Sequence, residues 1–225
     1  MSVSTQHRFP IVIGVVGGVA SGKSTLTEVL QKYGAKVIVA DDIAHDVLKD
    51  PIVIQQLQEI FGNGILSSSR TSQEISKDKS SEQALGTIDR KKLGALVFGL
   101  STVQRSRRKQ LEAIVHPRIR EIAKAQLKVL QAEPALKYIV LDAPLLIEGG
   151  WLPYCNKVVF LDTPAELRMT WAMSRGWSEQ EWQQRESAQL SLGKKRFNAT
   201  DIIVNTGNRE CLENEVSTML NNWNC

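Results

Sequence analysis

The stretch GGVASGKS at residues 17–24 constrains the fold more than any other part of the chain. It satisfies the pattern G-x-x-x-x-G-K-[ST] and lies between an apolar run, residues 9–16, and a segment with helical spacing, residues 24–33. An apolar run without helical periodicity predicts a strand that is buried on both faces of a parallel sheet. The sequence therefore predicts a strand, a phosphate-binding loop (P-loop) and a helix, in that order, within an α/β fold.

Each residue type in this loop has a physical role in holding phosphate groups. Glycines let the backbone approach phosphate oxygens closely, and successive N–H groups at a helix N-terminus form a positively polarised concavity. We expect Lys23 to reach the β- and γ-phosphates and the Ser24 hydroxyl to coordinate Mg²⁺. The loop thus predicts a nucleoside triphosphate and a magnesium ion without specifying the reaction. The residues predicted to contact the nucleotide here are Gly18, Val19, Ala20, Ser21, Gly22, Lys23, Ser24 and Thr25.

Further strands and helices alternate along the chain, which predicts a parallel five-stranded sheet flanked by helices. We expect strands at 36–40, 138–141, 157–161 and 202–204, and helices at 43–48, 91–100 and 109–130. Pro117 should kink or break the last of these helices. Residues 67–81 are polar and nearly free of large apolar groups, so they predict a mobile surface loop.

The composition excludes several classes of protein. No apolar stretch approaches the roughly 20 residues of a membrane span, and residues 1–10 lack the core of a signal peptide, so we expect a cytoplasmic protein with no membrane partner. The 3 cysteines are widely spaced and form no metal-ligand pattern. The net charge of +4 is mildly basic, and aromatic residues are not interleaved with the basic clusters. This favours a small polyanionic substrate over nucleic acid.

Among proteins with such a loop, a metabolite kinase fits best. A GTPase would carry an Asn-Lys-x-Asp stretch, but Asn156 and Lys157 are followed by Val159 where the aspartate belongs. Motor and transporter ATPases are normally longer. A nucleotide-dependent switch or binding module remains the alternative from a different class.

Asp41 and Asp42 follow the second predicted strand directly. We expect that strand to lie beside the first, so that its carboxyl end is near the γ-phosphate. Side chains alternate along a strand, so only one of the two carboxylates can face the phosphates. That one could accept the proton of an attacking hydroxyl, and the other suits the N-cap of the next helix. Both could instead be helix-terminal charges. Asp142 ends the third strand and could hold a water molecule bound to Mg²⁺.

Several stretches in order resemble the dephospho-CoA kinase family over roughly residues 11–207. They are the P-loop, IVADDIA, LEAIVHPRI, APLLIEGG and RESAQLSLGKKR. The resemblance implies an ATP-dependent phosphorylation of the ribose 3′-hydroxyl of dephospho-CoA, the last step of coenzyme A synthesis. It also implies a core at 9–62 and 131–225, a mostly helical acceptor-binding insert at 63–130, and a lid at 168–196. Another nucleoside or small-metabolite kinase is the alternative within the enzymes.

The resemblance assigns Asp41 as the base on the 3′-hydroxyl and leaves Asp42 as the cap. Two positions depart from the family pattern, since Val39 replaces an aspartate and His45 stands where an arginine is common. Residues matching the family's acceptor positions are Arg90, His116, Arg118 and Glu148. For His116 a bond to the backbone at the proline break is an equally good interpretation, and for Glu148 a structural role is nearly as good. The cluster at 105–109 is more typical of a solvated face than of phosphate steering.

The lid is expected between the fourth and fifth strands. Ser178 and Glu181 form a capping-box pattern that predicts a helix start, with the helix running to about 190. The family shows Gln-x-x-Arg-x-x-x-Arg before it, and here the positions hold Arg168, Trp171 and Arg175. Arg175 therefore matches a lid cation, and Arg168 is a candidate to replace the one missing at Trp171. The ending NTG places Asn205 near the adenine of ATP by the same resemblance.

Overall fold

The computed structural model describes residues 9–67, 86–99, 101–143 and 145–223. The chain divides into two compact units, which we call the first unit (Met1–Ala40 and Lys124–Cys225) and the second unit (Asp41–Ala123). The division begins at Asp41, earlier than the insert at 63–130 that we expected from the sequence.

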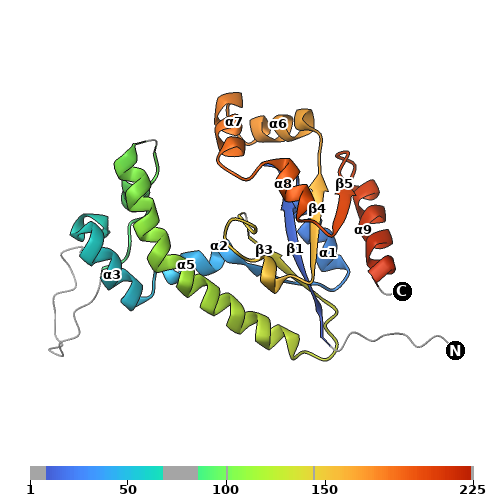
Figure 1. Ribbon diagram of the computed structural model, residues 1–225, viewed down its shortest axis with the longest axis horizontal. Coiled ribbons are helices and arrows are strands. Elements are labelled where there is room, and N and C mark those ends of the chain that lie inside the picture. The colour runs from blue at the N-terminus through green and yellow to red at the C-terminus, as the bar shows by residue number, and fades with distance from the viewer. Residues whose placement is uncertain (1–8, 68–85, 100, 144, 224–225) are drawn as a thin grey trace, which may run out of the picture. The chain divides into compact units, whose positions relative to one another are not determined.

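The first unit contains a parallel five-stranded sheet, as predicted (Figure 1). Its strands are β1 (Ile11–Gly17), β2 (Lys36–Val39), β3 (Tyr138–Asp142), β4 (Lys157–Asp162) and β5 (Asp201–Val204). Their order is β2-β3-β1-β4-β5, and every neighbouring pair is parallel.

The expected pairing of the second strand with the first is wrong, because β3 lies between them. All seven residues of β1 are buried, whereas only one of the four residues of β2 is buried. A short, partly exposed strand suits the edge of a sheet, and the apolar strands β1 and β3 suit its centre.

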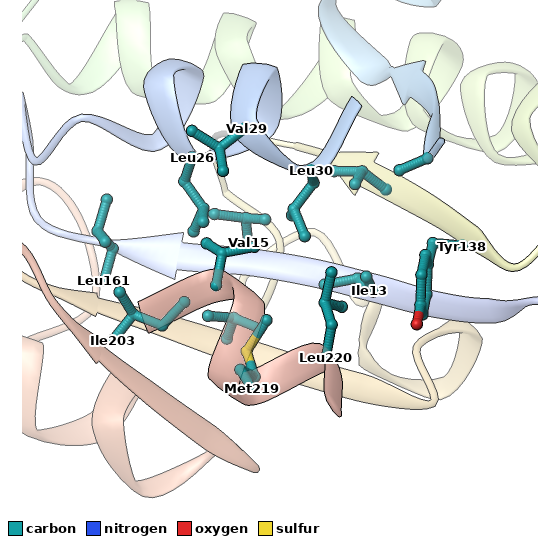
Figure 2. Packing of buried hydrophobic residues seen from close by; sticks show 14 of the residues in the cluster. Ile13, Val15, Leu26, Val29, Leu30, Tyr138, Leu161, Ile203, Met219 and Leu220 are labelled. Carbon is teal, nitrogen blue, oxygen red and sulfur yellow. The ribbon is translucent and has the colours of Figure 1, made fainter. Parts of the chain in front are cut away.

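The first unit also contains helices. They are α1 (Lys23–Lys32), α6 (Ala165–Ser174), α7 (Glu179–Ser187), α8 (Leu192–Phe197) and α9 (Arg209–Trp223), with a short turn η2 (Leu152–Tyr154). Helices α1 and α9 cover one face together. Figure 2 shows Leu26 and Leu30 of α1 and Met219 of α9 packed with Val15 of β1 in one buried cluster.

The strand–loop–helix unit predicted from residues 9–33 is confirmed. Helix α1 ends at Lys32, and Gly34 follows with φ +84°, the left-handed conformation that commonly ends a helix. Helix α7 begins with the predicted capping box between Ser178 and Glu181 but ends at Ser187, three residues earlier than expected.

The second unit is mostly helical, with α2 (Ala40–Val47), α3 (Pro51–Phe61), η1 (Asn63–Ile65), α4 (Arg90–Val97) and α5 (Thr102–Gln131). Helices α2 and α5 extend across the boundaries of the two units. Asp50 caps α3 by accepting the N–H of Ile52, and Pro51 takes the first helical position, where its missing N–H costs nothing. The expected mobile loop at 67–81 lies, apart from its first residue, outside the described residues.

One expectation for this unit is wrong, and another is narrowed. Helix α2 begins at Ala40, so Asp42 lies inside its first turn and does not cap it. Of the kink or break expected at Pro117, the break does not occur, because α5 continues through this residue. A proline removes one hydrogen bond to the carbonyl four residues earlier. Both Pro117 and Ala113 are exposed, so water can take the place of that bond.

Candidate active site

The P-loop presents unpaired backbone donors at the start of α1. Gly22 is the N-cap residue of α1 with φ +90°, and no side chain caps the helix. The first N–H groups of a helix have no partner within the helix, so they are available to an anion. A Cβ on Gly22 would lie 2.8 Å from Nδ2 of Asn205, so glycine is required here for space as well as for conformation.

Carbonyl oxygens of the loop are occupied by donors from other segments. The oxygen of Ser21 accepts from Thr163 Oγ1 at 2.8 Å and from Asn205 Nδ2 at 3.0 Å. The oxygen of Gly17 accepts from Nζ of Lys195 at 3.1 Å. Asn205, Thr163 and Lys195 are all buried. The loop is therefore held in place by bonds to its acceptors, which leaves donors for a ligand.

Lys23, the first residue of α1, bends back over the loop. Its Nζ donates to the oxygen of Gly18 at 2.8 Å. The pKa of Lys23 is lowered from 10.5 to about 8, chiefly by burial and next by the charge of Lys195, while the charges of Asp142 and Glu186 oppose the shift. A partly desolvated ammonium beside a second cation is suited to receive phosphate charge.

Two oxygen groups near the loop suit a magnesium ion. Ser24 is exposed in the first turn of α1, and Asp142 is the last residue of β3, close enough to raise the pKa of Lys23. Carboxylate and hydroxyl oxygens are hard donors of the kind that Mg²⁺ prefers. Among the described residues no group of three or more His, Cys, Asp or Glu could hold a metal.

A cavity of about 260 Å³ adjoins the loop in the first unit. Arg175 and Asn205, both candidates from the sequence, line it together with Trp171. Arg175 is exposed and follows the last residue of α6. The lining also includes Gly22 and Thr25 of the P-loop segment and Arg209 of α9.

Two cations at this site are buried: Lys195, which the sequence did not identify as a site residue, and Arg168, which it offered only as a replacement lid cation. Lys195 is 3% exposed, and its Nζ also donates to Gln189 at 2.5 Å; burial lowers its pKa. Arg168 is 4% exposed and pairs with Glu186, with 2.7 Å between Nη1 and Oε1. Arg168 is therefore committed to a contact inside the protein, away from the cavity-lining positions. The polar sequence around Lys195 gave no signal of burial, because its partner Gly17 is far away in the chain.

The remaining candidates occupy exposed or already bonded positions. Asp41 is exposed in the first turn of α2, two residues after Val39, which pairs in register with Asp142 of β3. In the first unit, Oε1 of Glu148 accepts the N–H of Leu190 at 2.8 Å. This contact ties the segment after β3 to the segment after α7.

In the second unit, Arg90 is the exposed first residue of α4, and His116 is exposed on α5. Partial burial lowers the pKa of His116, and Arg120 and Arg108 act in the same direction. Arg118 already pairs with Asp50 at 3.1 Å and Glu121 at 2.7 Å, so it is engaged in the absence of a ligand.

The sheet order and the loop between β1 and α1 define a P-loop kinase fold, and solved structures agree. One crystal structure, of TT1252 from Thermus thermophilus, matches with a TM-score of 0.73 and 30% identity, covering 95% of this chain and 97% of that chain. Another, of dephospho-CoA kinase from Campylobacter jejuni, matches with a TM-score of 0.58 and 28% identity, covering 94% and 96%.

The family model of dephospho-CoA kinase matches residues 11–210, and the chain belongs to this family. The dephospho-CoA kinase of Rhodopirellula baltica is 32% identical over 219 residues, covering 97% of this chain and 94% of the relative. That of Geobacillus kaustophilus is 34% identical over 215 residues, covering 95% and 96%. The protein is thus a kinase of coenzyme A synthesis, as the sequence predicted. None of the described helices is long and apolar enough to cross a membrane.

Proposed function

We propose that the protein transfers the γ-phosphoryl group of ATP to the 3′-hydroxyl of the ribose of dephospho-CoA. The observation that carries the proposal is the P-loop, whose oxygens are bonded to buried donors and whose first helical N–H groups are uncapped. Membership of the dephospho-CoA kinase family supplies the acceptor. The cavity lined by Trp171, Arg175 and Asn205 is the proposed place of the adenine.

In this proposal the triphosphate is held by Lys23 and by those N–H groups of residues 18–25 that have no acceptor among the described residues. The N–H groups of Val19 and Ser21 are not among them, because they donate to Glu186 and to the Gly18 oxygen. When nucleotide arrives, the Lys23 ammonium exchanges its bond with the Gly18 oxygen for phosphate oxygens. Ser24 and Asp142 would hold Mg²⁺, which would neutralise charge on the β- and γ-phosphates. Phosphoryl transfer depends mainly on such positioning and charge stabilisation.

Asp41 is the proposed general base. Its carboxylate takes the proton of the ribose 3′-hydroxyl as that oxygen bonds to the γ-phosphorus. The bond from this phosphorus to the β–γ bridging oxygen breaks, and ADP leaves. The exposed position of Asp41 leaves its carboxylate accessible to a hydroxyl group. A positioned base of this kind typically contributes about 10²–10⁴ in rate.

Arg90, His116, Arg118 and Glu148 are the proposed acceptor-side residues, and Arg175 is the proposed lid cation. The acceptor carries a pyrophosphate, so cations on α4 and α5 suit it chemically. Arg118 is already shared between two carboxylates, so a substrate phosphate would have to compete with Asp50 and Glu121. Arg175 lines the cavity, where it can approach a bound nucleotide. Lid closure over the site would exclude water as a competing acceptor.

A coupled ADP-release assay with a panel of acceptors tests this function. With ATP and Mg²⁺, dephospho-CoA should support rapid ADP release, while nucleosides, shikimate and gluconate should not. Rapid release with one of those acceptors would favour a different metabolite kinase. Slow hydrolysis that no acceptor accelerates, with tight retention of ADP, would favour a nucleotide-dependent switch.

A further inference from the structure

Helix α7 holds the outer turn of the P-loop at Val19. Oε2 of Glu186 accepts the N–H of Val19 at 2.8 Å. One helical turn earlier, the indole Nε1 of Trp182 donates to the oxygen of Val19 at 3.3 Å. Residues four positions apart lie on the same face of a helix, so α7 binds both backbone polar groups of one P-loop residue.

Arg168 of α6 supports this contact from behind. Its Nη1 pairs with the second carboxylate oxygen of Glu186 at 2.7 Å, and its Nε donates to the oxygen of Thr163 at 3.1 Å. The guanidinium lies 5.3 Å from the centre of the Trp182 ring. A Cβ on Gly18 would overlap this guanidinium. Arg168 therefore packs directly against the loop and fixes the residues that bind Val19.

The turn that α7 contacts also has a backbone conformation that needs stabilising contacts from other segments. Ala20 has φ +60°, which makes it the one non-glycine with positive φ among the described residues. Such a conformation persists only where surrounding contacts hold it. Ala20, Val19, Trp182 and Ala172 form one buried apolar cluster. Most other residues of α7 are exposed, so this attachment is the main one the helix makes.

We propose that Glu186 and Trp182, braced by Arg168, form a clamp that positions the outer turn of the P-loop for the terminal phosphates of the nucleotide. The three are positioning residues, because they act through the backbone of Val19. By taking the N–H and oxygen of Val19, the clamp fixes the loop that leads to Lys23. The inference rests on the proposed nucleotide site and adds residues to it.

The test compares Glu186→Ala with Glu179→Ala, an exposed glutamate on the same helix that serves as the matched control. The dissociation constant of ATP is measured by calorimetry without acceptor, and KM is measured for ATP and for dephospho-CoA. We expect Glu186→Ala to raise both nucleotide constants by up to about 10²-fold, while KM for dephospho-CoA changes less than about twofold. Glu179→Ala should match the wild type in all three quantities. Hydrogen exchange at the peptide containing Val19 should speed up only in Glu186→Ala.

The double variant Arg168→Gln/Glu186→Gln distinguishes positioning from simple loss of folding. It keeps an acceptor for Val19 and removes both charges together, so it should recover most of the ATP affinity. Unchanged ATP affinity in a folded Glu186→Ala protein would overturn the clamp, and so would equal losses for both substrates. Tighter ATP binding would overturn it too, since the carboxylate would then be a competitor of phosphate. If the wild-type protein released no ADP with dephospho-CoA, the proposed function would be refuted. The ADP-release assay measures this separately from ATP affinity.

Discussion

The two compact units hold their candidate residues in different ways. In the first unit, Arg168, Lys195 and Asn205 are at most 4% exposed, and each makes at least two hydrogen bonds. In the second unit, Asp41 and Arg90 are exposed. The proposed nucleotide site is thus organised without a ligand, whereas these proposed acceptor-side groups are open to solvent and must lose contact with water when a substrate binds. Binding energy from the acceptor must therefore provide that desolvation.

The largest effect expected from this contrast concerns the exposed base. Asp41→Asn should lower kcat by about 10²–10⁴ because the hydroxyl proton loses its acceptor. ATP affinity, measured by calorimetry, should stay close to that of the wild type, because the site of the first unit is already formed. Asp42→Asn, in the same turn of α2, is the control and should retain nearly full kcat. A large loss of ATP affinity in Asp41→Asn would break the contrast between the units.

A buried cation of the first unit should matter for stability more than an exposed one. Arg168→Leu leaves Glu186 without its partner, and breaking a buried pair costs about 3–5 kcal/mol. We expect the lower end, because 26% of the Glu186 side chain is exposed. Arg90→Leu should stay within about 0.5 kcal/mol. Urea unfolding followed by circular dichroism measures both, and equal losses would remove the distinction between the two sites.

The pKa of Lys23 makes nucleotide binding depend on pH. Because this pKa is about 8, Lys23 loses its charge above pH 8, and the dissociation constant of ATP should rise by up to about tenfold per pH unit there. Between about pH 8 and 10.5 the unfolded chain binds the proton that the folded protein has released. The unfolding free energy should therefore rise with pH in the same window. Lys23→Arg stays charged, so a similar pH profile for this variant would assign the effect to another group.

The smallest effect is expected at the basic cluster of α5. Arg108 forms an exposed pair with Glu112, and such pairs contribute about 0–1 kcal/mol. Arg108→Ala should change the KM for dephospho-CoA by less than about twofold at physiological salt. A tenfold rise that disappears at high salt would show that the cluster steers the substrate.

The sequence predicted those parts of the fold that depend on neighbouring residues. The P-loop, the left-handed glycine after α1 and the capping box of α7 all follow from side chains within a few positions of one another. The position of β3 between β1 and β2 could not be predicted in this way. The strand order depends on where β3, the first strand after the second unit, joins the sheet. No pattern of neighbouring residues determines that position.

The same distinction separates the site residues that were predicted from those that were missed. Lys23 and Ser24 are defined by a local motif. Lys195 was missed, and Arg168 was predicted only as a replacement lid cation. Their burial depends on Gly17 and Glu186, which lie 178 and 18 residues away in the chain. For the aspartates, the sequence predicted that they follow a strand, but it placed Asp42 at the helix cap. Ala40 fits a strand end and a helix start equally well, so the sequence did not locate the start of the helix. The helix start at Ala40 became visible only in the structure.

The bonds to the P-loop oxygens have a consequence for selectivity. The carbonyl of Gly17 receives a donor from Lys195, that of Val19 from Trp182, and that of Ser21 from Thr163 and Asn205. Backbone oxygens repel anions and attract metal ions, so an unmasked loop would tend to gather stray cations and push polyphosphates away. Because protein donors already bond these oxygens, the loop selects a ligand by its negative charge. The nucleotide base is not selected by the loop.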